Sequence, residues 1–140
     1  MSKTKSASRT GYKFQYAAKF ICTANIPGTS QTSDAVVPGS YQTSVNIHNP
    51  QNVKVKLRKK IASPIGISNY FEFVLEPDGV AGVTCAQIRD FGLHLIHGFE
   101  GFLVIESTHS VDVVAVYSAA GKEQVSSIDV EGIKERKLLR

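Results

Sequence analysis

Apolar and polar residues alternate along most of this 140-residue chain with a period of two, which is typical of β-strands. The stretch 14–22 places a mostly aromatic and apolar set on one side: Phe14, Tyr16, Ala18, Phe20 and Cys22. The same alternation predicts further strands at 44–48, 53–58, 71–76, 80–83, 101–107, 111–117 and 126–130. So many short strands, with no regular alternation of strands and helices, favour an all-β protein.

Two local signals indicate how strands are connected. A Pro-Asp-Gly sequence at 77–79 predicts a tight turn between two strands. Thr84 and Gln87 have the spacing of a capping box, which predicts a short helix beginning at Cys85. Gly92 would end this helix in the left-handed conformation.

Together these elements predict a single domain. We expect an antiparallel β-sandwich of seven or eight strands over residues 13–132, with one short helix near residues 85–91. Residues 1–12 are predicted to be a flexible basic tail, and residues 133–140 a charged tail. Residues 25–40 are rich in Gly, Pro, Ser and Thr and form an unusually long predicted loop, whose role the pattern leaves open.

The two strongest strands, near the carboxyl end, are apolar on both faces. The stretch 102–105 reads Phe-Leu-Val-Ile, and the stretch 113–116 reads Val-Val-Ala-Val. One face of an antiparallel sheet commonly meets water and is polar. Either the short helix and long loops or another subunit must therefore cover the second face, and we expect a homo-oligomer.

The stretch 44–60 combines a histidine and asparagines at a proline with a run of basic residues. We predict a β-hairpin whose valines and leucine face the core. With a three-residue loop Asn46 lies opposite Lys54, whereas with a five-residue loop His48 lies opposite Lys54. In both registers a polar, basic stripe faces away from the core.

This stripe supplies the candidate binding residues: His48, Lys54, Lys56, Arg58 and Lys60. The alternative interpretation is the solvated face of a hairpin. Sheets that bind nucleic acid generally add exposed aromatic side chains for base stacking. No aromatic residue interrupts this stripe, and Tyr41 falls on the opposite face, so the pattern leaves only contacts with the phosphate backbone.

The net charge of +4 is concentrated in three clusters. They comprise Lys3, Lys5, Arg9, Lys13 and Lys19, the basic residues of 54–60, and Lys134, Arg136, Lys137 and Arg140. Such clusters suit a phosphate backbone or an acidic partner, although basic tails and one solvated strand would look the same. Binding of nucleic acid or another polyanion is therefore an alternative function.

Cys22 and Cys85 lie far apart and form no CxxC motif, so the chain has no zinc or thiol redox signature. We interpret them as two buried small apolar residues, with a disulfide as the alternative. The basic, serine-rich start carries no apolar signal region, and no run of 18 apolar residues occurs. We therefore expect a soluble, cytoplasmic protein without membrane insertion.

Signals for catalysis are sparse. His94 and His97 lie among glycines without an HExxH spacing, and we interpret them as structural rather than as metal ligands. Cys85 would lie at a helix N-terminus, but no base or oxyanion site accompanies it, and we interpret it as structural too. We expect no catalytic residue, no metal and no cofactor. A hydrolase or metal enzyme that uses His48, His94 or His97 is the remaining alternative.

Three stretches carry a family resemblance: TSVNIHNPQNVKVKLRKKIASP, FVLEPDGVAGVTCAQIRDF and GFEGFLVIESTHSVDVVAVYSA. In this order they resemble a group of small, uncharacterised bacterial β-sandwich proteins and, less closely, the sensory rhodopsin transducer family. The likeness covers residues 40–120 and lies in the order of strands and turns more than in identical residues. The basic amino terminus and residues 25–40 have no counterpart in it.

The resemblance implies an oligomeric sandwich that acts as an interaction or ligand-binding module without enzymatic activity. It carries no functional residue across to this chain. We therefore expect a homo-oligomeric binding module whose further partner is an unknown protein or small ligand.

Overall fold

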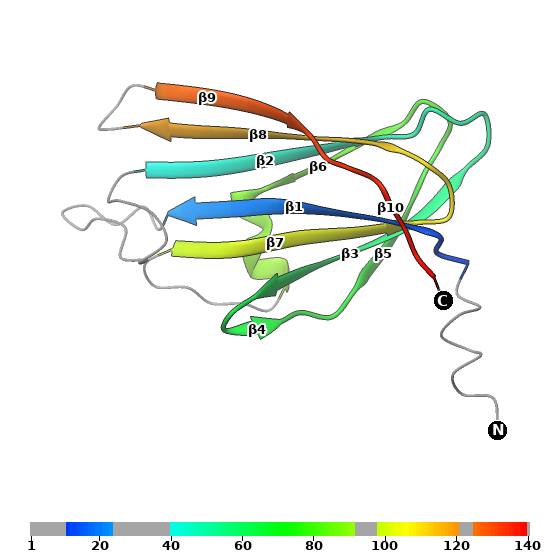
Figure 1. Cartoon of the computed structure of the whole chain (residues 1–140), viewed down its shortest axis with the longest axis horizontal. Helices are drawn as coiled ribbons and strands as arrows, with labels where there is room; N and C mark the ends of the chain where they lie inside the picture. Colours follow the sequence, from blue (N-terminus) through cyan, green and yellow to red (C-terminus); the bar gives the residue numbers. More distant parts are fainter. Residues whose placement is uncertain (1–10, 24–39, 92–97, 121–124, 140) are drawn as a thin grey trace.

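The alternating strands build two antiparallel sheets that pack face to face, as a computed structural model shows (Figure 1). The structure describes residues 11–23, 40–91, 98–120 and 125–139. The six-stranded sheet comprises β1 (Phe14–Thr23), β3 (Val55–Ser63), β4 (Gly66–Ile67), β5 (Phe71–Leu75), β7 (Gly98–Ser107) and β10 (Arg136–Lys137). The four-stranded sheet comprises β2 (Ser40–His48), β6 (Val80–Thr84), β8 (Asp112–Ala120) and β9 (Val125–Gly132).

The expected all-β antiparallel sandwich is therefore confirmed. The strand order is β10-β1-β7-β3-β4 in the larger sheet, where β5 also pairs with β3, and β6-β2-β8-β9 in the smaller one. The alternation predicts every described strand except β4 and β10, which have two residues each and are too short for a periodic signal.

The core lies between the sheets and is built from the residues that alternation places on one side of each strand. On β1 these are Tyr16, Ala18 and Phe20, which are almost fully buried. Val45 and Ile47 of β2 meet them from the other sheet and are completely buried. Burial of such side chains is the main favourable term in folding.

The predicted hairpin over 44–60 is wrong. β2 pairs with β6 and β8, whereas β3 pairs with β4, β5 and β7, so the two strands lie in different sheets and neither predicted register occurs. Their apolar faces enter the same core from opposite sides. A hairpin and two strands in different sheets give the same alternation of apolar and polar residues. The alternation shows that one face of a strand is buried, but it does not show which strand pairs with it.

The predicted helix is confirmed as a 3₁₀-helix, η1 (Cys85–Phe91). The side-chain Oε1 of Gln87 accepts a hydrogen bond of 2.8 Å from the backbone N–H of Thr84, as the capping box requires. Gly92, the predicted end of this helix, lies outside the described residues. In the described part of the chain no helix is long and apolar enough to cross a bilayer.

Cys22 and Cys85 form a disulfide, which was the alternative in the sequence analysis and corrects the interpretation as two separate buried apolar residues. Cys22 lies near the end of β1 in one sheet, and Cys85 directly follows β6 in the other. Folding brings their Cα atoms to 5.8 Å, although 63 positions separate them along the chain. The bond therefore links the two sheets at one end of the sandwich, and Cys85 has a structural role.

Both ends of the domain extend beyond the predicted limits. Tyr12 is buried, and β10 pairs with the start of β1. The buried hydroxyl of Tyr16 donates a 2.6 Å hydrogen bond to Glu135. Burial first, and then this bond, raises the pKa of Tyr16 to about 12. Residues 133–137 are thus attached to the sandwich rather than forming a tail.

Candidate functional site

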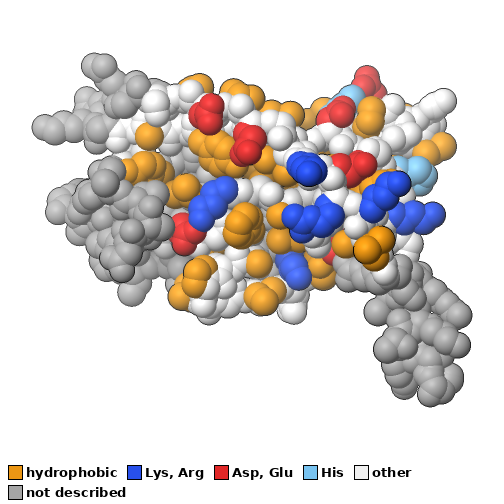
Figure 2. Space-filling view, viewed as in Figure 1, with side chains coloured by type: hydrophobic (Ala, Val, Ile, Leu, Met, Phe, Trp, Pro, Cys, Tyr) orange, Lys and Arg blue, Asp and Glu red, His pale blue; other side chains and the backbone are white. Residues whose placement is uncertain are grey.

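The basic candidate residues of β3 lie on the outer face of the six-stranded sheet. Lys56, Arg58 and Lys60 point away from the core, as expected, whereas Val55, Leu57 and Ile61 are buried and Lys59 is partly buried. Lys54 precedes β3, and its Nζ lies 3.6 Å from a carboxylate oxygen of Glu76. Figure 2 shows Lys and Arg side chains gathered over β1, β7 and β3, with hydrophobic side chains between them.

Arg58 is engaged within the protein. Its Nε and Nη2 lie 2.8 and 2.6 Å from one carboxylate oxygen of Glu106, which is completely buried. Tyr70 and Gln15 donate hydrogen bonds of 3.1 and 3.2 Å to the other oxygen. The guanidinium lies between the rings of Tyr12 and Tyr70, at 4.4 and 3.9 Å from their centroids. Arg58 therefore joins β3 to β7 rather than offering a charge to a ligand.

Aromatic side chains do accompany the basic stripe, which corrects the expectation from the sequence. The ring of Tyr70 lies 4.7 Å from Nζ of Lys60. Phe102 is 44% exposed, and its ring lies 5.5 Å from Nζ of Lys19. These rings come from neighbouring parts of the sheet, so reading along β3 alone cannot find them. The outer face of the six-stranded sheet thus combines cations with aromatic rings.

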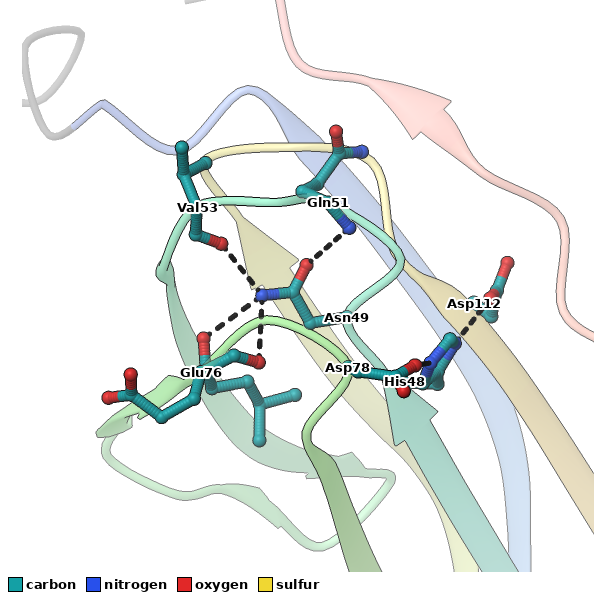
Figure 3. Close-up of polar contacts among 8 residues, drawn as sticks. His48, Asn49, Gln51, Val53, Glu76, Asp78 and Asp112 are labelled. Atoms are coloured by element: carbon teal, nitrogen blue, oxygen red, sulfur yellow. Dashed lines mark hydrogen bonds and ion pairs between the residues drawn. The ribbon is translucent and has the colours of Figure 1, made fainter.

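His48 lies at the end of β2 in the four-stranded sheet, whereas the lysines of β3 belong to the other sheet. Figure 3 shows its ring next to Asp78 and Asp112. It stands opposite Asp112 of β8 rather than Lys54. Nδ1 lies 2.8 Å from Asp112, and Nε2 lies 2.6 Å from Asp78. The bond to Asp112, and then that to Asp78, raises the pKa of His48 above its usual 6.5. Both ring nitrogens are thus occupied by carboxylate partners within the protein.

Asn49 follows His48 and is completely buried. Its side-chain amide donates to the carbonyls of Val53, Leu75 and Glu76 at 2.9 to 3.0 Å, and its carbonyl accepts from the N–H of Gln51 at 2.8 Å (Figure 3). It thereby joins the crossing from β2 to β3 with the end of β5. Asn49 therefore has a structural role.

The outer face of the four-stranded sheet carries an apolar cluster. Val114, Ile128 and Val130 are 37%, 62% and 60% exposed, and Val116 is partly buried. Val116 pairs with Val130, and Ile128 stands beside them opposite Ser118. We call Val114, Val116, Ile128 and Val130 the apolar outer patch. This finding agrees with the expectation that β8 is apolar on both faces.

A groove of about 390 Å³ lies at the opposite edge of the sandwich, between β5 and η1. It is lined by Lys59, Phe71, Glu72, Phe73, Gln87 and Phe91. Its lining combines three aromatic rings with the ammonium of Lys59 and the carboxylate of Glu72, and Nζ of Lys59 lies 5.1 Å from the centroid of the Phe73 ring.

Other candidates from the sequence are not placed. His94, His97 and positions 25–39 of the predicted loop lie outside the described residues. Within the described ranges, no three His, Cys, Asp or Glu side chains are grouped so that they could hold a metal ion.

Comparison with known proteins identifies the fold but no family. No model of a protein family matches the chain, and no curated protein is detectably similar to it. The crystal structure of Thermotoga maritima 1070 is similar, with a TM-score of 0.56 over 89% of this chain and 95% of that protein. The two sequences are 14% identical, so the likeness supports a shared fold alone.

Proposed function

We propose that this protein is an interaction module without enzymatic activity, which associates with itself through the apolar outer patch. The observation that carries the proposal is the grouping of Val114, Val116, Ile128 and Val130 on two paired strands of an outer face. Single exposed apolar side chains are ordinary on protein surfaces, but a contiguous group of them marks an interaction site. An isologous contact between two copies would bury this patch on both.

A charge placed in the patch tests this proposal. Val114→Asp should shift the protein toward monomer in size-exclusion chromatography with light scattering, because an unpaired carboxylate would be buried at the contact. Val74→Asp is the matched control, since Val74 is 53% exposed on a strand of the other sheet. If both variants keep the oligomeric state of the unaltered protein, the patch is not the contact.

The outer face of the six-stranded sheet favours a second function, polyanion binding. Lys56 and Lys60 point outward from β3, and Tyr70 and Phe102 supply rings beside the cations. Sheets that bind single-stranded nucleic acid combine these two kinds of side chain. His48 and Arg58, two of the predicted binding residues, take no part because both are engaged with carboxylates within the protein.

Charge reversal at the two lysines tests this second function. The double variant Lys56→Glu and Lys60→Glu should lose at least about tenfold in affinity for heparin or single-stranded DNA at low salt, since each contact with a phosphate adds to binding. Arg58 is left unchanged, because its replacement would leave the buried carboxylate of Glu106 without its neighbouring guanidinium. Lys134→Glu, near the carboxyl end, is the control. Equal binding by all three proteins would exclude this face as the site.

We keep the cytoplasm, expected from the sequence, as the proposed location, but the disulfide between Cys22 and Cys85 counts against it and provides its test. Disulfides are rare in a reducing cytosol and persist in oxidising compartments. Rapid acid quenching of cells, followed by thiol alkylation and mass spectrometry, should find Cys22 and Cys85 alkylated if the protein is cytoplasmic. Recovery of the intact disulfide would contradict that location.

A further inference from the structure

β9 forms one edge of the four-stranded sheet, since it pairs with β8 at the end of the order β6-β2-β8-β9 (Figure 1). It is eight residues long, and Ile128 and Val130 on it are largely exposed. A long edge strand with exposed apolar side chains is a ready template for an added strand.

The backbone of β9 directs defined groups toward this edge, with which no other described strand pairs. Ile133 donates its N–H to the carbonyl of Val113 at 2.8 Å, so these two residues form a hydrogen-bonded pair. Hydrogen-bonded and non-hydrogen-bonded pairs alternate along antiparallel strands. Ile133 forms a hydrogen-bonded pair, so Val130 and Ile128, which lie three and five positions before it, form non-hydrogen-bonded pairs with β8. Their N–H and C=O groups therefore point outward, where an added strand can bind them.

The side chains that alternate with Ile128 and Val130 are acidic. Asp129 and Glu131 are exposed on the face of β9 opposite to the apolar outer patch. Asp129 also lines a groove of about 100 Å³ together with Tyr41 and Tyr117. A carboxylate and aromatic rings around a small hollow suit the ammonium or guanidinium of a Lys or Arg side chain.

The same acidic row disfavours pairing between the β9 strands of two copies. If the β9 strands of two copies paired antiparallel with Asp129 at the centre, Asp129 of one copy would face Asp129 of the other. With Val130 at the centre, Asp129 of one copy would face Glu131 of the other. Like charges directly opposite each other destabilise a sheet. In these two registers the edge disfavours pairing with itself, whereas a basic strand would place opposite charges there.

We propose that the edge of β9 binds an extended segment of a partner protein in which Lys or Arg alternates with Val, Ile or Leu. The partner's backbone pairs with Ile128 and Val130, as in other cases of strand addition. Its basic side chains face Asp129 and Glu131, and its apolar side chains extend the apolar outer patch. The inference rests on the proposed function in one respect, that the protein is an interaction module.

The test uses a soluble peptide with the core Lys-Val-Lys-Val-Lys and a second peptide with Glu in place of Lys. The lysine peptide should bind the unaltered protein in fluorescence anisotropy, and the glutamate peptide should not. Val130→Pro removes one outward N–H and should weaken binding at least about tenfold, since edge positions tolerate proline but lose the hydrogen bond. Val130→Ala, the matched control, keeps the N–H and should lose less than about threefold. Circular dichroism checks that both variants fold.

Charge specificity is tested by Asp129→Lys, which should weaken binding of the lysine peptide and permit binding of the glutamate peptide. Glu76→Lys makes the same change in net charge on an exposed residue elsewhere and should leave both affinities unchanged. Hydrogen exchange gives a direct readout, because the amides of Ile128 and Val130 should exchange more slowly once the lysine peptide is bound.

Three results would overturn the proposal: equal binding by the proline and alanine variants, equal binding of both peptides, or unchanged exchange at Ile128 and Val130. Binding only after deletion of residues 1–10 would also overturn it, because the occupant would then be the basic segment of this chain. Self-association is measured separately by sedimentation. If the protein is a monomer that binds the lysine peptide, the proposed self-association is wrong and the edge site is supported. If it is an oligomer that does not bind the lysine peptide, the self-association is supported and the edge site is wrong.

Discussion

At the scale of single residues, Asn49 stabilises the fold more than its appearance in a loop suggests. Asn49→Ala removes the donor for three carbonyl groups in a completely buried position. We expect a loss of about 3 kcal/mol in the free energy of unfolding, because the buried amide loses its hydrogen bonds to three carbonyl groups and to the N–H of Gln51 together. Asn52→Ala, at an exposed position of the same loop, should change it by less than about 0.5 kcal/mol. Urea unfolding measures both, and equal values would contradict the structural role.

His48 makes stability depend on pH in a direction set by its raised pKa. Because its pKa is higher in the folded than in the unfolded protein, protonation favours folding. This contribution is fully present below the unfolded pKa and is lost as the pH rises through the folded pKa. The difference in unfolding free energy between the unaltered protein and His48→Gln should therefore be larger at pH 5.5 than at pH 9. A difference that is constant or grows with pH would contradict the two carboxylate contacts.

At the scale of secondary structure elements, the pair of Arg58 and Glu106 joins neighbouring strands. Arg58→Met should cost about 3–5 kcal/mol, because it leaves a buried carboxylate without its cation. The double variant Arg58→Met and Glu106→Leu should recover a large part of this loss, since no charge is then buried. A double-mutant cycle from urea unfolding measures the coupling. Additive losses would show that the two groups do not act as a pair.

The disulfide stabilises the contact between the two sheets. Cys22 and Cys85 close a loop of 63 positions, for which the chain-entropy model predicts about 4 kcal/mol. The double variant Cys22→Ser and Cys85→Ser should lose stability of this order, and a reducing agent should have the same effect on the unaltered protein. The reducing agent should not change the free energy of unfolding of the double variant. This control separates loss of the disulfide from other effects of the reducing agent on stability.

Strands were predictable where one buried face imposes alternation, and the 3₁₀-helix was predictable from Thr84 and Gln87. Strand pairing was not predictable, because any antiparallel neighbour satisfies the alternation of β2 and β3. The same lack of pairing information hid the acidic partners of His48, the rings beside the basic stripe and the approach of Cys22 to Cys85. Local pattern thus gives elements and faces, whereas the site depends on contacts between strands far apart in the sequence.

At the scale of the whole molecule, the sandwich presents two unlike outer faces. The six-stranded sheet offers cations and aromatic rings, and the four-stranded sheet offers the apolar outer patch. Salt should therefore act on them in opposite ways. Raising it from 50 to 500 mM should weaken heparin binding steeply, because counterion release drives that binding. Self-association should persist or strengthen, because apolar contacts are not screened. Measuring both across this range separates the two faces.

Sedimentation equilibrium of the unaltered protein tests the central claim most directly. One chain has a mass of 15.2 kDa. If the apolar outer patch joins copies, the weight-average mass should rise above this value as the protein concentration increases from about 1 to 100 μM, a range in which contacts of micromolar affinity form. A single species of monomer mass across the whole range would contradict the account.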